Sequence, residues 1–193
     1  MKAKPTHWLR LAVLALLAML LALPVQAQGG QSVAPQAEPV AIEMVPASRF
    51  AVVGDTFRIQ VMVRSGAQPV YGAQVFINFN PKRLECLEVI PGGPLTDIFP
   101  LPDGAIDNVK GQVNYAAGKL LGDAASGSFE LVTLRMRALA ATSSTPLTYA
   151  VDKPRITTVV GGDGLRYPLQ LLEGQVSIAA SANTVRLPLI LRN

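Results

Sequence analysis

Histidine, tryptophan and cysteine are almost missing from this 193-residue chain, which has one of each: His7, Trp8 and Cys86. His7 and Trp8 lie within the first 27 residues, a leader that we expect to be removed. A mature chain without histidine has no Ser-His-Asp triad, no Cys-His pair and no imidazole zinc site. Without tryptophan, a large aromatic platform for stacking on sugar rings is also missing. A single cysteine excludes an intramolecular disulfide, so we expect Cys86 to be a small buried hydrophobe rather than a reactive thiol or an intermolecular bridge.

The N-terminus has the pattern of an export signal. Three basic residues precede Leu11–Leu23, an apolar run of 13 residues, and Val25-Gln26-Ala27 places small residues where signal peptidase cleaves. The run is short for a bilayer span, which takes about 20 residues. The sequence therefore predicts a signal peptide over 1–27, a secreted or cell-surface protein, and no membrane span after cleavage.

The charge of the chain changes when this leader is removed. The full sequence has 17 basic and 13 acidic residues, and loss of Lys2, Lys4 and Arg10 leaves 14 basic residues against 13 acidic ones. Because the remaining cations are dispersed and balanced, we expect no nucleic-acid partner.

The rest of the chain is organised as a leader, one domain and a tail. Residues 28–39 are rich in Gly, Pro, Gln and Ser, which predicts a flexible leader. From 40 to 179, short alternating runs are separated by turn signals, which predicts an all-β fold: a single antiparallel β-sandwich of the jelly-roll type with about nine strands. The C-terminal tail, 180–193, contains the apolar segment TVRLPLILRN, which is either a sorting or surface-attachment signal or else a frayed terminus or an extra edge strand. The nine expected strands are Val40–Val45, Thr56–Arg64, Val70–Phe79, Leu84–Ile90, Gln112–Ala117, Ser128–Leu139, Pro146–Val151, Ile156–Val160 and Gly174–Ala179.

The segment Val70–Gly93 carries the most specific pattern. Apolar residues alternate with others in the order expected of a strand with one buried face, Asn80-Pro81 makes a turn, and a second strand opens with Leu84-Glu85. The alternating apolar residues, predicted to lie in the core with Leu84, are Ala73, Val75, Ile77 and Phe79. The segment resembles the cohesin family, whose secreted modules bind dockerin domains in polysaccharide-degrading assemblies.

The resemblance implies a non-catalytic binding module. Its partner would be a dockerin-like domain, in extracellular polysaccharide degradation or cell-surface assembly. In cohesins the binding face combines the strand Val70–Phe79 with those matching Gln112–Ala117 and Ser128–Leu139. The outward positions implied here, and so the candidate ligand-binding residues, are Gln74, Phe76, Asn78, Asn114, Arg135 and Arg137. Alternation also predicts that Phe76 is exposed at the centre of this patch. Gln74 departs from the acidic residue that classical cohesins have on this strand.

Two alternatives remain open. A carbohydrate-binding module would bind polysaccharide directly through an aromatic row drawn from Tyr71, Tyr115, Tyr149 or Tyr167. The chain could also be a surface structural protein.

An enzyme is not expected, and no catalytic or metal-binding residue is assigned. Glu85 and Glu88 lie three apart on one expected strand and should point to opposite faces. Loop aspartates next to Gly or Asn usually serve turns. No cofactor is predicted; a structural calcium ion at Asp103–Asn108 or at Asp163 is the lesser alternative, because neither loop has the spacing of an EF-hand.

Overall fold

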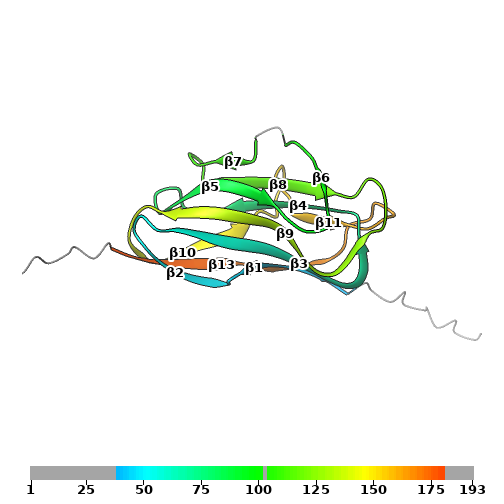
Figure 1. Cartoon of the computed structure of the whole chain (residues 1–193), viewed down its shortest axis with the longest axis horizontal. Coiled ribbons are helices and arrows are strands. Elements are labelled where there is room, and N and C mark those ends of the chain that lie inside the picture. The colour runs from blue at the N-terminus through cyan, green and yellow to red at the C-terminus, as the bar shows by residue number, and fades with distance from the viewer. Residues whose placement is uncertain (1–37, 102–103, 181–193) are drawn as a thin grey trace, which may run out of the picture. The chain divides into compact units, whose positions relative to one another are not determined.

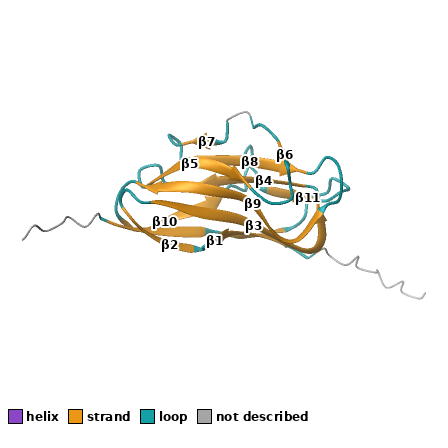
Figure 2. Ribbon diagram, in the orientation of Figure 1, coloured by secondary structure: helices purple, strands orange, loops and turns teal. Residues whose placement is uncertain are grey.

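The computed structural model describes residues 38–101 and 104–180. These residues form two stacked β-sheets and no helix (Figures 1 and 2). No helix in this part of the chain could therefore cross a membrane. The thirteen strands are β1 (Val40–Val45), β2 (Ser48–Val52), β3 (Thr56–Val70), β4 (Gly72–Asn78), β5 (Leu84–Pro91), β6 (Asp97–Ile98), β7 (Ile106–Asp107), β8 (Gln112–Gly118), β9 (Ala125–Ala138), β10 (Thr142–Tyr149), β11 (Thr158–Val160), β12 (Leu169–Leu172) and β13 (Gly174–Ala179).

One sheet has five strands in the order β12-β1-β3-β9-β5, and the other has eight, with the path β2-β13-β10-β4-β8-β6. Beside that path, β11 pairs with β4, and β7 pairs with β8. The predicted jelly-roll sandwich is confirmed, and each of the nine expected strands is present. The four strands that were not expected, β2, β6, β7 and β12, have two to five residues each.

Two strand pairs run parallel within this otherwise antiparallel fold: β1 with β12 and β2 with β13. The chain passes from the five-stranded sheet to the eight-stranded sheet at Val45-Pro46, a cis peptide bond. The first and last segments of the domain therefore run side by side in both sheets.

The core lies between the sheets. The first ten residues of β3 alternate in burial, and the inward residues Phe57, Ile59, Val61 and Val63 are all buried. They face the apolar side of the other sheet, where Val75, Ile77 and Leu147 are fully buried. Full burial of a large apolar side chain contributes roughly 1.5 to 3 kcal/mol, so this interior explains why the sheets stack.

Asn108 closes part of the β5 edge. Its side chain accepts a hydrogen bond from the Cys86 backbone N–H at 2.8 Å and donates one to the Cys86 carbonyl at 2.9 Å. The carboxamide thus fills the place that a neighbouring strand would take. Cys86 itself is buried, as expected, and burial raises the pKa of its thiol to about 11.

The expected signal peptide over 1–27, most of the leader over 28–39 and nearly all of the tail over 180–193 lie outside the described residues. Within the described part, the first strand begins at Val40 and the last ends at Ala179.

Candidate functional site

The strand β4 presents two different faces. Ala73, Val75, Ile77 and Phe79 point into the core and are buried, which confirms the predicted register. Gly72, Gln74, Phe76 and Asn78 lie on the outer face of the eight-stranded sheet. The expectation that Phe76 is exposed there is wrong, because only 8% of its surface is accessible.

Phe76 is covered by the segment between β10 and β11. The Ala150 N–H donates to the Phe76 carbonyl at 2.7 Å, and the Phe76 N–H donates to the Thr157 hydroxyl at 3.2 Å. The Arg155 guanidinium carbon lies 5.4 Å from the centre of the Phe76 ring, a cation–π contact. Alternation along β4 fixes the face on which Phe76 lies, but it gives no information about a loop that crosses this face.

Arg155 also donates hydrogen bonds to Asn78 and Asn114, two of the predicted ligand-binding residues. Its Nε donates to Asn114 Oδ1 at 3.0 Å, a terminal nitrogen donates to Asn78 Oδ1, and Nη2 lies 3.1 Å from the Ile77 carbonyl oxygen. Asn114 is buried, and its amide also donates to the Gly104 carbonyl at 3.0 Å. The two asparagines therefore hold Arg155 over Phe76. Sequence reasoning missed Arg155, which lies in a loop about 80 residues after Phe76 with no motif that relates the two.

Arg135 and Arg137 do not belong to this face. Both are on β9, which lies in the five-stranded sheet, so the six predicted residues are divided between two sheets. Stacked sheets lie about 10 Å apart. Arg135 pairs with Glu88, with Nε 2.9 Å from the carboxylate, and Arg137 pairs with Glu85. The assumption that Ser128–Leu139 shares a face with β4 is therefore wrong.

These ion pairs also correct the expected directions of Glu85 and Glu88. Both carboxylates lie on the outer face, because a bulge at Leu87 shifts the register between Cys86 and Glu88. Each glutamate is opposite an arginine of β9, so the two acids are not arranged as a catalytic pair.

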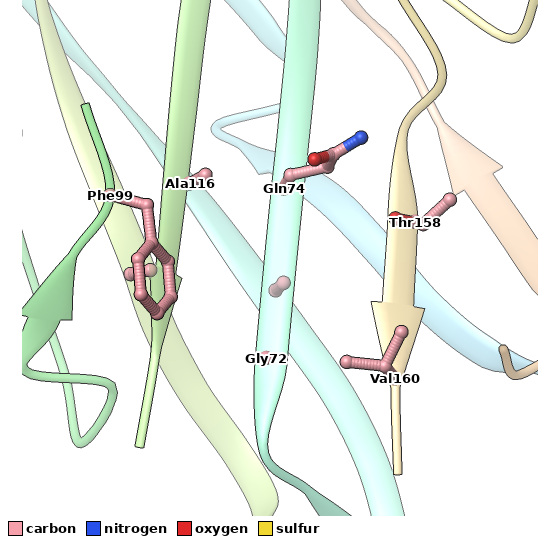
Figure 3. Close-up of a pocket in the computed structure, with 8 residues that line it drawn as sticks. Gly72, Gln74, Phe99, Ala116, Thr158 and Val160 are labelled. Atoms are coloured by element: carbon pink, nitrogen blue, oxygen red, sulfur yellow. The ribbon is translucent and has the colours of Figure 1, made fainter. Parts of the chain in front are cut away.

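A groove lies on the eight-stranded sheet at the Gly72 end of β4 (Figure 3). Its floor contains Gly72 and Ala116, which have little or no side chain. Phe99, which follows β6, forms one wall, and Thr158 and Val160 of β11 form the other. The hollow has a volume of about 180 Å³.

Small residues keep the groove open and let its walls approach the sheet. A Cβ at Gly72 would lie 3.0 Å from a methyl carbon of Val160, and one at Gly118 would lie 2.8 Å from the Phe99 ring. Gln74 lies at the end of the floor, with its amide nitrogen donating to the Ile156 carbonyl at 2.7 Å. No charged residue lines this groove.

Two of the loop aspartates, Asp107 and Asp163, serve turns. Asp107 accepts hydrogen bonds from the N–H groups of Lys110 at 2.9 Å and Val109 at 3.0 Å, and the Lys110 ammonium lies 3.4 Å away. These contacts, led by the Lys110 N–H, hold the pKa of Asp107 below its usual value. Asp163 accepts from the Leu165 N–H at 3.0 Å. Within 38–101 and 104–180, no group of His, Cys, Asp and Glu side chains is arranged to hold a metal ion. Asp103 lies outside the described residues.

The four tyrosines do not form an aromatic row. Tyr115 and Tyr149 are buried in the core, and the Tyr167 hydroxyl donates to the Pro69 carbonyl at 2.8 Å. Tyr71 remains partly exposed beside Gly162. The platform that direct sugar stacking needs is therefore reduced to one or two rings.

Comparison with known proteins identifies the fold. No protein-family model matches the sequence, and a search of curated proteins finds no similar sequence. Solved structures do match: a cohesin of Clostridium acetobutylicum has a TM-score of 0.61 and 15% identity, with 74% of this chain and 92% of that one covered. A type I cohesin in a cohesin–dockerin complex from Clostridium thermocellum has a TM-score of 0.59 and 14% identity, with 73% and 99% covered. A non-cellulosomal cohesin from the archaeon Archaeoglobus fulgidus has a TM-score of 0.56 and 17% identity, with 73% and 91% covered.

This chain is a cohesin-like domain in its fold, as the resemblance of Val70–Gly93 predicted. At 14–17% identity the likeness concerns the fold, and the binding residues must be assigned from the geometry of this chain.

Proposed function

We propose that this chain is a non-catalytic protein-binding module that holds a dockerin-like domain in the groove beside Gly72 and Ala116. Two of the similar structures were solved as cohesin–dockerin complexes from Clostridium thermocellum. That pairing supports a dockerin-like partner, and the groove lies open on the outer face of β4 and β8.

The span of the sheet between the groove walls is the observation that carries the proposal. Its walls belong to β6 and β11, which are three strand spacings apart in the order β6-β8-β4-β11. At about 4.8 Å per spacing, the wall backbones are about 14 Å apart. An α-helix with its side chains is about 10–12 Å across, whereas a single extended strand takes up about 5 Å. The outer face across these four strands is therefore wide enough for a helix that lies along them and inserts side chains into the hollow of about 180 Å³.

The remaining features of the chain agree with binding rather than catalysis. The outward glutamates of β5 are paired with arginines, and Asp107 and Asp163 accept hydrogen bonds from N–H groups of their own turns. The signal-peptide pattern over 1–27 supports an extracellular setting, where attachment of polysaccharide-degrading enzymes or assembly at the cell surface would take place.

The proposal is tested with purified dockerin modules encoded in the same genome as this chain. Isothermal titration of the full-length protein against each module should find at least one that binds with a Kd below about 10 μM, which corresponds to roughly 7 kcal/mol. Ala116→Leu should abolish this binding, because it fills the floor of the groove without reaching the core. Ala47→Leu, at an exposed position in the turn between β1 and β2, is the matched control and should bind normally.

A genome without dockerins, or a panel in which none binds, overturns the proposal. If Ala116→Leu binds a dockerin module as well as the parent protein does, the partner is right but the groove is not the binding site. Binding of soluble polysaccharides in place of dockerins would favour the carbohydrate-binding alternative.

A further inference from the structure

The strand β2 forms one edge of the eight-stranded sheet, where it pairs in parallel with β13 (Figure 1). The β13 segment bonds to the Ala47 carbonyl at 2.9 Å and, six residues on, accepts the Val53 N–H at 3.0 Å. In a parallel pair, every second residue directs its N–H and C=O groups to the neighbouring strand. Ser48, Phe50 and Val52 therefore direct theirs away from β13, toward the open side of the edge.

Only one of these three residues has its backbone groups occupied. The Asp55 carboxylate accepts the Val52 N–H at 2.8 Å, and the Asp55 N–H donates to the Val52 carbonyl at 2.9 Å. Among residues 38–101 and 104–180, nothing pairs with the backbone groups of Ser48 and Phe50. The β2 edge is therefore a ready template for a further strand.

An uncharged surface lies beside this edge. The Phe50 side chain is 67% exposed and stands on the outer face of the sheet, next to Ser177 of β13. It borders a hollow of about 440 Å³. The other residues that line the hollow are all uncharged: Ala141, Thr142, Ser143, Ser177, Ile178 and Ala179. Covering the Phe50 ring would remove apolar surface from water and would be favourable.

The chain leaves the described residues close to this edge. Ala179, the last residue of β13, pairs with Val52 at the end of β2. The far side of β2 is two strand spacings from β13, about 10 Å. Residues 180–183 span up to about 13 Å when they are extended, so they can carry the chain past the end of β2.

The segment that follows has the pattern of an edge strand. In 184–191, which we call the tail segment, apolar residues occupy every second position. It contains no acidic residue, and it has one proline, Pro188, a residue that sheets accept at their edges. The alternating apolar residues, which would share one face of a strand, are Val185, Leu187, Leu189 and Leu191.

We infer that the tail segment adds a strand to the open edge of β2 and covers Phe50 with its apolar face. The added strand runs antiparallel to β2, because the chain must reverse its direction after β13. Its backbone supplies the partners that the Ser48 and Phe50 groups lack within the described residues. The tail segment thereby closes the edge against pairing with other chains.

Amide hydrogen exchange of the full-length protein, followed by NMR, tests this inference. The Ser48 and Phe50 amides should exchange about tenfold or more slowly than exposed amides, because the tail segment accepts their hydrogen bonds. Nuclear Overhauser effects should also connect the Phe50 ring with leucine methyl groups of the tail segment.

Leu189→Asp should remove both signals and accelerate exchange at Ser48 and Phe50 about tenfold, because it places a carboxylate against the ring without a partner. The matched control is Leu165→Asp, at a position that is 67% exposed in the turn between β11 and β12, and it should change neither signal. The buried Val61 amide in β3 should stay slow in every variant, which shows that the domain remains folded.

Phe50→Ser tests the same contact from the side of β2. Because Phe50 is largely exposed, the domain should stay folded, while the amides of the tail segment should lose their protection.

Three results would overturn the inference. The first is fast exchange of the Ser48 and Phe50 amides in the parent protein, and the second is protection that Leu189→Asp leaves unchanged. The third is protection that rises with protein concentration together with a dimer in sedimentation, which would assign the edge to a second copy of this chain. Since β2 lies three positions from β4 in the sheet, the dockerin proposal and this inference can fail independently.

Discussion

The guanidinium of Arg155 lies over the ring of Phe76, with its central carbon 5.4 Å from the ring centre. This contact divides the outer face of β4 into a covered half around Phe76 and an open half around Gly72. The most apolar side chain on the outer face of the strand is therefore a structural element, and the open half around Gly72 is the part of that face left for the proposed partner.

Arg155→Ala should destabilise the domain by roughly 2 to 4 kcal/mol. The substitution removes the cation–π contact and leaves Asn78 and Asn114 without their shared donor. Urea unfolding measures the loss. Arg155→Lys keeps a cation over the ring but lacks the planar fork, so it should fall between the parent and the alanine variant. Equal stabilities of all three proteins would show that Arg155 does not hold this face together.

Ile77→Ala should cost about 2 to 5 kcal/mol, because Ile77 is fully buried between the sheets. Gln74→Ala, three residues away on the outer face, should cost only about 1 kcal/mol, for the hydrogen bond to the Ile156 carbonyl. The free energies of unfolding of both variants are measured by denaturant titration. A larger loss of stability for Gln74→Ala than for Ile77→Ala would contradict the register of β4.

Arg135→Ala and Arg137→Ala should leave binding of any groove partner unchanged, because both arginines lie on the opposite sheet. Their exposed pairs with Glu88 and Glu85 contribute less than about 1 kcal/mol each. Titration of each variant with the dockerin panel tests the placement. A tenfold loss of affinity would move the binding surface to the five-stranded sheet.

Cys86 should make the domain less stable at high pH. Burial raises the pKa of its thiol from 9.0 to about 11, so between these values the unfolded chain releases its proton while the folded chain retains it. The free energy of unfolding should therefore fall as pH rises from about 9 to 11, by roughly 2 kcal/mol.

Cys86→Val serves as the comparison for this effect. Burial also raises the pKa of Tyr149, but both proteins share that contribution. The difference between their unfolding free energies, measured at several pH values, isolates the thiol. Parallel curves would mean that Cys86 does not titrate differently on folding.

Local patterns in the sequence were sufficient to predict the β-sandwich and the core-facing residues of β4. Alternation of Val75 and Ile77 with polar neighbours depends only on adjacent residues, so the register could be predicted. The bulge at Leu87 changes that period by one residue, and nothing in the sequence marks it, so Glu85 and Glu88 were assigned to opposite faces.

The candidate site was harder to predict because it depends on contacts between distant segments. Arg155 reaches Phe76 from about 80 residues away, and the position of β9 is set by the strand order of the whole sandwich. The two-residue strand β6, which brings Phe99 to the groove, is too short to give a periodic signal.

The hydrogen bonds from Asn108 to Cys86 bear on the solubility of a protein expected to work outside the cell. β5 is an edge strand, and an edge with free N–H and C=O groups can act as a template for another chain. At Cys86 both groups are already occupied by one side chain, and the bulge at Leu87 then breaks the straight ladder that a second strand would need. The domain can thus keep an apolar surface for its partner on one sheet while the β5 edge of the other is protected against aggregation.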